Sequence, residues 1–518
     1  MSITLSDRDK SILRTAAYGA VSLMAATGTP HKAATNASTA LTSATGLVGH
    51  ILATKSKNIE STGKTVAALA DQVLPALTAA VILLEKQDPA EAGNFRNTVL
   101  VAVEAAAQTQ AQGRLNPATA EMARKITAAL GAAGAASADS GTVPVAAAGH
   151  DRPELRQALE EIVDSGIAGI TLRVHDERGE WVGSAGVSKL GETAEPPVDG
   201  HVRIGSNTKT FTATLVLQLV AEGRIGLDKP VADYLPEFGL DERITVRMLL
   251  QHTSGIFNFT GEYYDDGTFA PGIPATTAGK EWVDNRFTTY QPEDLVRLAL
   301  SKPARFEAGA GWSYSNTNYV LARLLIEKIT CRPVAQEMQR LILGPLGLTG
   351  TMAPTTRTDV PEPHAHAYYR YEDGGQEKTV DVTRHNPSWI SSGGDMISTT
   401  RDLHTFISAL MSGELLPAEL LAEMCTPRPT PIPNMGYGLG VFVQDTGRGG
   451  TVVTHNGGAA GHAAMMFSTP DGSTTLTAAL NYVDDAALSL AVPFQKAVQR
   501  LVDEVFCGGK ADPAQPTG

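Results

Sequence analysis

A serine followed three residues later by a lysine, Ser206 and Lys209, is the part of this chain best suited to attack a carbonyl group. A serine hydroxyl is a weak nucleophile until a base within hydrogen-bond reach takes its proton. If Ser206 opens a helix, residues i and i+3 share a face, so the Lys209 amine returns beside the hydroxyl. The pair therefore predicts acyl transfer through a covalent intermediate on serine.

The same spacing also arises by chance, and the chain contains a second example at Ser61 and Lys64. That example lies in an alanine-rich helical stretch and has no polar companions. Ser206 instead follows Val202–Gly205 and precedes a helical pattern that continues to Ala221. The start of such a helix presents free N–H groups, which favour the negative charge that develops during attack.

Tyr314 and Asn316 form a second polar group further along the chain. A phenol held beside an ammonium group can lose its proton far below its ordinary pKa of about 10. Tyr314 is therefore a candidate general base, with its phenolate favoured by Lys209. Alone, the two residues are equally consistent with a polar loop in which Asn316 caps a turn.

The third group is His455–Gly458, which follows Thr451–Thr454, a segment with the pattern of a buried strand. We expect an edge strand here, because a strand that ends in glycines lets a substrate approach closely and offers it N–H donors. A lone histidine before Asn-Gly is more often a turn residue. Taken together, however, the three groups predict one pocket.

These motifs resemble the serine β-lactamase and penicillin-binding-protein superfamily, in the branch with class C β-lactamases, DD-carboxypeptidases, D-aminopeptidases and esterases. Two further segments agree with that branch: a helix-to-turn signature at 241–256 and a Gly-x-x-x-Ser-Thr segment at 394–399. The resemblance extends from about residue 154 to residue 507. It implies a serine hydrolase that forms an acyl-enzyme with amide or ester substrates.

The resemblance also implies roles for individual residues. Ser206 is the nucleophile, and Lys209 and Tyr314 share its proton and later protonate the leaving group. The oxyanion lies between the backbone N–H groups of Ser206 and Gly458, and the Asn316 side chain holds the substrate amide. His252 belongs to a structural turn in the family, so we keep it out of the catalytic set.

Within the branch, the sequence is most similar to secreted DD-carboxypeptidases, which implies that Trp389 lines the mouth of the pocket. His455, Asn456 and Gly457 form the substrate-binding strand, with His455 in place of a lysine found in many members. Phe442 aligns with an arginine that binds the substrate carboxylate, and phenylalanine offers no such hydrogen bonds. Strict carboxypeptidase action is therefore disfavoured, unless Arg448 restores the positive charge.

The fold implied by the resemblance is α/β (α+β): an antiparallel sheet flanked by helices, with an all-helical lobe inserted between the first and last strands. The hydrolase domain covers 151–508, and its first and last strands should be neighbours in the sheet. Before it, apolar positions at helical spacing predict an all-α N-terminal domain over 1–136 of unknown function, in which Pro75 kinks or splits a helix. We expect a linker at 137–150 and a disordered tail at 509–518.

Composition limits the partners of this chain of 518 residues. A formal net charge of −13 disfavours nucleic acid and anionic membrane surfaces. No run of about 18 apolar residues predicts a membrane span, and the N-terminus does not resemble a secretory signal. With only three cysteines and no disulfide framework, we expect a cytoplasmic enzyme, with export by another route left open. The N-terminal helices could mediate homo-oligomerisation.

We expect neither a metal nor a cofactor. His364 and His366 could supply half of a metal site, but no third ligand is near them in the sequence, and no glycine-rich phosphate loop follows a strand. The predicted substrate is a small molecule or a short D-amino-acid peptide or ester. Two alternatives remain: a peptide cyclase or transacylase of the same fold, and a penicillin-recognising sensor that turns over slowly.

Overall fold

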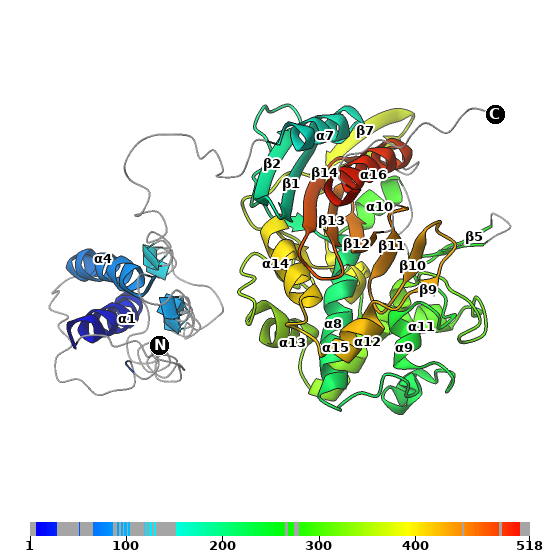
Figure 1. Cartoon of the computed structure of the whole chain (residues 1–518), viewed down its shortest axis with the longest axis horizontal. Coiled ribbons are helices and arrows are strands. Elements are labelled where there is room, and N and C mark those ends of the chain that lie inside the picture. Colours follow the sequence, from blue (N-terminus) through cyan, green and yellow to red (C-terminus); the bar gives the residue numbers. More distant parts are fainter. Residues whose placement is uncertain are drawn as a thin grey trace. The chain divides into compact units, whose positions relative to one another are not determined.

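The computed structural model describes residues 7–27, 66–85 and 152–507 apart from 265–267, 274–278, 448–449 and 486–488, together with isolated positions between 51 and 130. The chain divides into an N-terminal unit, Met1–Ala146, and a C-terminal unit, Ala147–Gly518 (Figure 1). This division falls inside the predicted linker. The linker itself, the predicted tail and the Ser61–Lys64 pair lie outside the described residues.

The N-terminal unit has a hydrophobic core of its own. Its two long helices, α1 (Asp7–Thr27) and α4 (Val66–Glu85), pack against each other. A Cβ atom on Gly19 of α1 would lie 2.6 Å from a methyl group of Val73 in α4, so the glycine permits the close approach of the helices. Pro75 lies inside α4 and does not split it. The close contact between these two helices thus depends on the absence of a side chain at Gly19.

The C-terminal unit is built on an eight-stranded antiparallel sheet in the order β2-β1-β14-β13-β12-β11-β10-β9 (Figure 1). In chain order its strands are β1 (Gly169–Asp176), β2 (Gly179–Gly186), β9 (Arg428–Pro429), β10 (Met435–Tyr437), β11 (Phe442–Asp445), β12 (Thr451–Ala459), β13 (His462–Ser468) and β14 (Thr475–Asn481). The first strand pairs with the last, from Gly169 opposite Asn481 to His175 opposite Thr475. The predicted neighbourhood of first and last strands is therefore confirmed.

Successive side chains of a strand point to opposite faces of the sheet, so each face carries its own set of side chains. Helices cover both faces. On one face, α7 (Pro153–Asp164) and α16 (Ala491–Cys507) contact each other and share a core with Ile170, Leu172 and Leu480. On the other face, α14 (Thr400–Met411) contacts β1, β13 and β14. The sheet is thus the middle layer of three.

The inserted lobe consists mainly of helices, as expected. These are α8 (Thr208–Ala221), α9 (Val246–Leu250), α10 (Lys280–Asn285), α11 (Pro292–Leu300), α12 (Asn316–Thr330), α13 (Val334–Met338), a π-helix (Gln339–Leu343) and α15 (Ala418–Met424). Short pairings complete the unit: β3 (Val202–Arg203) with β8 (Ile397–Ser398), β4 (Glu262–Tyr263) with β5 (Phe269–Ala270), and β15 (Val483–Asp485) with β6 (Tyr368–Asp373) and β7 (Gln376–Asp381).

Helix α8 passes through the centre of the lobe and is buried on nearly all sides. Its threonines have no contact with water, so their hydroxyls need partners inside the protein. Thr210 donates to the carbonyl of Gly440 (2.8 Å), and Thr212 donates to the carbonyl of Ser392 (3.0 Å). These bonds fix α8 against two loops from distant parts of the chain.

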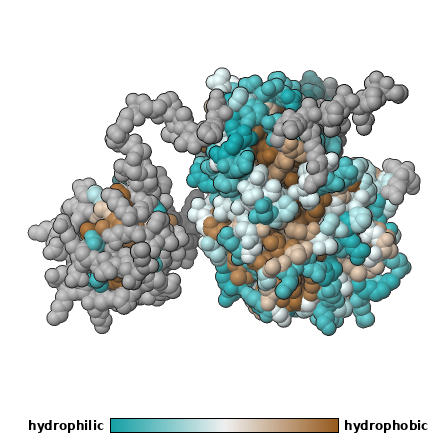
Figure 2. Space-filling view, in the orientation of Figure 1, coloured by the Kyte–Doolittle hydropathy of each residue, from teal (hydrophilic) through white to brown (hydrophobic). Residues whose placement is uncertain are grey.

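The surface of the C-terminal unit is uneven in character. Figure 2 shows hydrophilic residues gathered over the end that carries α7 and β2, whereas apolar residues come to the surface between the helices of the lobe. Within the part of the chain that the structure describes, none of the helices combines the length and apolar character that crossing a membrane requires. Cys331, Cys425 and Cys507 are all unpaired thiols.

Candidate active site

Ser206 lies in a short 3-10 turn, Gly205–Asn207, between β3 and α8. The predicted helix therefore begins two residues later than expected, but the spacing of three residues to Lys209 still brings the two side chains together. The backbone of β12 passes directly against this turn: a Cβ atom on Gly457 would lie 2.1 Å from the backbone nitrogen of Ser206. Gly205 adopts a φ of +49°, and a Cβ atom there would lie 2.5 Å from the nitrogen of Gly458. Only glycine fits at either position.

The prediction that β12 is an edge strand is wrong for its first half. Thr451 to Thr454 pair with β11 on one side, and β13 pairs on the other. From His455 onwards only β13 continues the ladder, so one side of the Asn456–Gly458 backbone is free of strand pairing. The backbone that could accept a substrate is therefore the half of β12 that lies beside the Ser206 turn.

Lys209 is completely buried, and its side chain is held in one position. Nζ lies 3.2 Å from the Ser206 hydroxyl oxygen, and it donates to the Asn316 side-chain oxygen and to the Gly393 carbonyl, both at 2.7 Å. Burial lowers the pKa of Lys209 well below its ordinary 10.5. A neutral amine has two N–H groups and one lone pair. The two short bonds use the N–H groups, which leaves the lone pair for the Ser206 proton.

The surroundings of the Tyr314 hydroxyl do not favour the predicted phenolate. The Tyr314 hydroxyl is buried, with the Ser206 side chain nearby, although the residue as a whole is partly exposed. Burial raises the pKa of Tyr314 above its ordinary 10, and nearby Ser206 only partly opposes that rise. The Lys209 amine lies over the ring face, 4.6 Å from its centroid, and a neutral amine lacks the positive charge that the predicted phenolate requires. Tyr314 is a protonated phenol, suited to pass a proton on.

Asn316 begins α12, and all of its side-chain polar atoms have partners within the protein. Besides accepting from Lys209, it donates its side-chain amide to the Thr260 hydroxyl (3.1 Å). Its backbone N–H donates to the Asn258 side chain (3.0 Å). The predicted contact with a substrate amide stays a prediction, and the Asn316 side chain itself holds Lys209 in place.

The loop that supports Asn316 contains no recognisable motif and was not predicted from the sequence. This support loop, residues 256–262, is anchored by the carboxylate of Glu262, which accepts from the Asn258 N–H (2.9 Å) and from the Arg305 guanidinium (3.0 Å). The Glu262 side chain is only 5% exposed. Burial raises the pKa of Glu262, while Arg305 acts in the opposite direction. The ion pair between Glu262 and Arg305 thus supports the loop that holds Asn316.

His252 supports the other side of the site, in agreement with its assignment to a structural turn. The Ser315 N–H donates to Nδ1 of His252 (3.2 Å), and the His252 ring lies 4.4 Å from the Tyr314 ring, centroid to centroid. Burial lowers the pKa of His252 well below its ordinary 6.5, so the imidazole is neutral. The contact fixes the segment that carries Tyr314.

His455 has its ring buried on β12, with both nitrogens occupied. Nδ1 donates to the carbonyl of Asn456 (2.8 Å), and Nε2 accepts from the Tyr437 hydroxyl (3.2 Å). Burial lowers the pKa of His455 to about 3. Phe442 stands beside it, 5.3 Å between ring centroids, and packs its ring edge-to-face with Tyr437. The three rings form an aromatic wall. Phe442 supplies one of these rings at the position that aligns with a carboxylate-binding arginine.

The remaining predicted substrate residues are more exposed. Asn456 and Gly458 are exposed on β12, Gly457 is half-buried, and Trp389 is half-buried at the end of a 3-10 turn, Pro387–Trp389. Their contacts with substrate stay predictions. Arg448 lies outside the described residues.

His364 and His366 lie away from this site, with ring centroids 5.4 Å apart. Nδ1 of His366 is 2.6 Å from the Asp381 carboxylate, and Nδ1 of His364 is 3.1 Å from the Pro361 carbonyl. Among the residues that the structure describes, no group of three or more His, Cys, Asp or Glu side chains is arranged to hold a metal ion.

Known proteins share this fold and this sequence pattern. A D-stereospecific amidohydrolase from Streptomyces sp. is 38% identical, and its structure matches 70% of this chain and 100% of its own with a TM-score of 0.60. Penicillin-binding protein 4* of Bacillus subtilis (strain 168) is 25% identical over 344 residues, which cover 64% of this chain and 71% of that protein. Esterase EstB of Burkholderia gladioli is 35% identical over 160 residues, 29% of this chain and 38% of the esterase.

The β-lactamase family matches residues 155–494, which is most of the C-terminal unit. The match includes the turn with Ser206, the start of α12 and the whole of β12. Relatives of this chain include an amidohydrolase, an esterase and penicillin-binding proteins, which together make it one of a group of serine hydrolases. The chain therefore belongs to the β-lactamase family, as its motifs predicted.

Proposed function

We propose that this protein hydrolyses amides of D-amino acids, and the corresponding esters, through an acyl-enzyme on Ser206. The observation that carries the proposal is the buried Lys209 amine, which lies 3.2 Å from the Ser206 oxygen and has both N–H groups committed elsewhere. Burial keeps that amine neutral at a pH where an exposed lysine is charged. It can therefore act as a general base without first losing a proton to water.

In the acylation step, Lys209 takes the hydroxyl proton while the Ser206 oxygen bonds to the substrate carbonyl carbon. The carbonyl oxygen becomes an oxyanion, for which the backbone N–H groups of Ser206 and Gly458 are the proposed donors. When the C–N bond breaks, the Tyr314 hydroxyl protonates the leaving amine and recovers a proton from Lys209. Water then attacks the ester on Ser206 by the same route in reverse, which releases the acid.

The choice of D-amino-acid amides rests on two observations. The Streptomyces relative with 38% identity is described as a D-stereospecific amidohydrolase, and this chain covers its whole length. In addition, Phe442 contributes to an aromatic wall beside His455, where a guanidinium would be needed to bind a free carboxylate. An amide or ester group carries no such charge, so it suits this wall better than a peptide with a C-terminal carboxylate.

The test compares D- and L-phenylalanine amides and nitrophenyl esters, with intact-mass measurement after exposure to a fluorophosphonate. We expect hydrolysis of the D-amide, one adduct on Ser206, and loss of both in Ser206→Ala. A serine away from the site, Ser412→Ala, serves as the control and should keep both.

Lack of any adduct on Ser206 contradicts covalent catalysis. A stable penicillin adduct with no turnover of amide or ester favours the sensor instead, and release of the acyl group to added amines rather than water favours the transacylase.

A further inference from the structure

Asn207 directly follows the nucleophile, and its side chain is buried away from water. A buried amide is costly unless its polar atoms have hydrogen-bond partners. An asparagine at the start of a helix usually caps that helix by accepting from a backbone N–H. Asn207 precedes α8 but makes no such bond, and its φ of −55° and ψ of −26° are helical instead of extended. Helix capping therefore does not explain this residue.

The Asn207 side chain instead connects two segments that are distant in the sequence. Its amide nitrogen donates to the Ile204 carbonyl (2.8 Å) and to the Ala464 carbonyl on β13 (3.0 Å). An amide nitrogen has two N–H groups, so each carbonyl receives one of them. Among the residues that the structure describes, the Asn207 side-chain oxygen has no partner. The contribution of this side chain thus lies in its nitrogen, which joins the Ser206 turn to the sheet.

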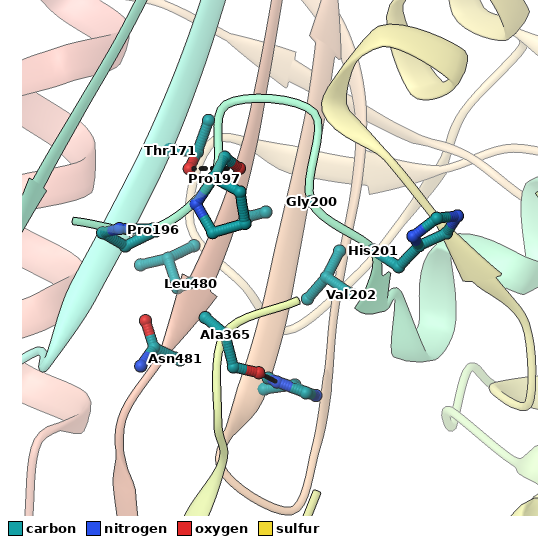
Figure 3. Close-up of a pocket in the computed structure, with 11 residues that line it drawn as sticks. Thr171, Pro196, Pro197, Gly200, His201, Val202, Ala365, Leu480 and Asn481 are labelled. Carbon is teal, nitrogen blue, oxygen red and sulfur yellow. Dashed lines mark hydrogen bonds between the residues drawn. The ribbon is translucent and has the colours of Figure 1, made fainter. Parts of the chain in front are cut away.

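In the described part of the chain, strand pairing does not fix the position of the Ser206 turn on the eight-stranded sheet. The chain approaches the turn through the segment 196–202, which lies beside a cavity of about 20 Å³ lined in part by Ala365 and Asn481 (Figure 3). It then enters β3, which pairs with β8 in a separate two-stranded sheet. Other contacts must therefore hold the turn in place on the larger sheet.

The bond to Ala464 reaches the pair of strands that also carries the second proposed oxyanion donor. Ala464 lies opposite Gly457 of β12, the residue before Gly458. The glycines let the turn come close to β12, but close packing alone does not orient the turn, whereas a hydrogen bond has a preferred direction. The Asn207 amide therefore relates the position of the Ser206 N–H to that of the Gly458 N–H.

We propose that Asn207 is a positioning residue for the oxyanion: its amide holds the Ser206 N–H where it and the Gly458 N–H donate to one oxygen. The inference rests on the proposed acyl-enzyme at Ser206. A donor to the oxyanion contributes about 10²–10³-fold to kcat, and a displaced donor loses part of that contribution. Asn207 is 0% exposed, so it acts without touching the substrate. Its effect is therefore the same for amides and esters, whatever the leaving group.

The variant Asn207→Ser tests the bond that crosses to β13. A serine hydroxyl has one hydrogen and a shorter reach, so it keeps the bond to Ile204, three residues earlier, and loses the bond to Ala464. We expect kcat to fall roughly tenfold or more for both D-phenylalanine amide and a nitrophenyl ester, with KM changed by less than about twofold. The control is Thr214→Val, which removes an equally buried hydroxyl that is bonded to Thr210 within α8. Losses no larger than those of the control, a change confined to KM, or a loss for the amide alone overturn the proposal.

The rate at which a fluorophosphonate labels Ser206 separates this inference from the proposed substrate. Labelling also places an oxygen between the two N–H groups, and it requires no assumption about the substrate. If the natural protein is labelled but leaves D-phenylalanine amide intact, the proposed substrate class is wrong, and labelling alone decides the inference. A labelling rate about tenfold lower in Asn207→Ser supports the positioning role, and an unchanged rate overturns it.

A crystal structure of the natural protein with phenylboronic acid bonded to Ser206 gives a test that does not depend on the folding of a variant. The boronate is tetrahedral and carries an oxygen where the oxyanion forms. We expect that oxygen within about 3.1 Å of the backbone nitrogens of both Ser206 and Gly458, with the Asn207 amide bonded to Ala464. An oxygen that reaches only one of the two nitrogens, or an Asn207 amide turned away from Ala464, overturns the proposal.

Discussion

Two regions of the site are built in different ways. The reacting corner, formed by Ser206, Lys209, Tyr314 and Asn316, rests on buried groups, and both N–H groups of the Lys209 amine are bonded within the protein. The rim, formed by the exposed half of β12 with Phe442 and Trp389, consists of exposed or half-buried groups. The side chains of the reacting corner are held in place for one reaction, whereas substitutions in the rim should leave the fold intact. Substitutions in the corner should therefore cost far more activity than substitutions in the rim.

The largest loss is expected for Lys209→Met, which keeps the apolar stem but removes the base. The kcat/KM for amides and esters should fall by about a thousandfold or more, since a positioned base contributes about 10²–10⁴-fold. In the natural protein, kcat/KM should fall as the pH drops through the lowered pKa of Lys209, because protonation removes the lone pair. That acidic limb should be absent in the variant. An exposed lysine, Lys378→Met, is the control and should show the natural pH profile.

Tyr314→Phe should come next, and its effect should depend on the leaving group. The variant keeps the ring that packs on His252 but loses the hydroxyl that protonates the leaving amine. We expect amide hydrolysis to fall by about a hundredfold or more, and nitrophenyl ester hydrolysis by about tenfold or less, since nitrophenolate leaves without a proton. Equal losses for the two substrates would assign Tyr314 a different role. Tyr371→Phe, on β6, serves as the control.

A smaller loss is expected at the support loop, one step away from the corner. Glu262→Gln removes the negative charge that accepts from both Arg305 and the Asn258 N–H, which loosens the loop that holds Asn316. We expect kcat to fall by roughly tenfold with little change in KM, because the loop acts on Lys209 through Asn316 and not on the substrate. Adding Arg305→Gln should cost less than the two single losses combined. The control is Glu307→Gln, which breaks an exposed ion pair with Arg243 and should change kcat by less than about twofold.

The smallest change in overall activity is expected at the rim. Phe442→Arg introduces a guanidinium on β11 and should leave ester hydrolysis within about twofold of the natural protein, while improving cleavage of peptides that end in a free D-alanine carboxylate by roughly tenfold. Gln444→Arg adds the same charge two residues further along β11, beside Val452 instead of Thr454, and should not have this effect. If both variants behave alike, the charge acts over a distance and Phe442 does not face the substrate.

The sequence predicted the fold through the family resemblance, and it predicted the proximity of Ser206 to Lys209 through their local spacing. Three residues from Ser206 to Lys209 bring the side chains together whether the serine opens an α-helix or, as here, a 3-10 turn. The proximity of β1 and β14 followed from the family resemblance and is confirmed by their pairing.

Other features could not be predicted, because they depend on burial and on residues distant in the chain. The protonation states of Lys209 and Tyr314 are set by the absence of water around them, which no motif records. Arg305 meets Glu262 through folding of the lobe, and neither residue stands in a recognisable pattern. The pairing of β11 with only the first half of β12 is likewise a tertiary property.

Helices α7 and α16 contact each other on one face of the sheet, so the chain enters and leaves the C-terminal unit at neighbouring points (Figure 1). Proteins with adjacent ends tolerate circular permutation. A permutant could join the end of α16 to the start of α7 and open the chain at the exposed turn between β6 and β7, at Gly374 and Gly375. Such a chain would carry the N-terminal unit at a new attachment point. Its activity would show whether the chemistry at Ser206 depends on the order in which the two units are joined.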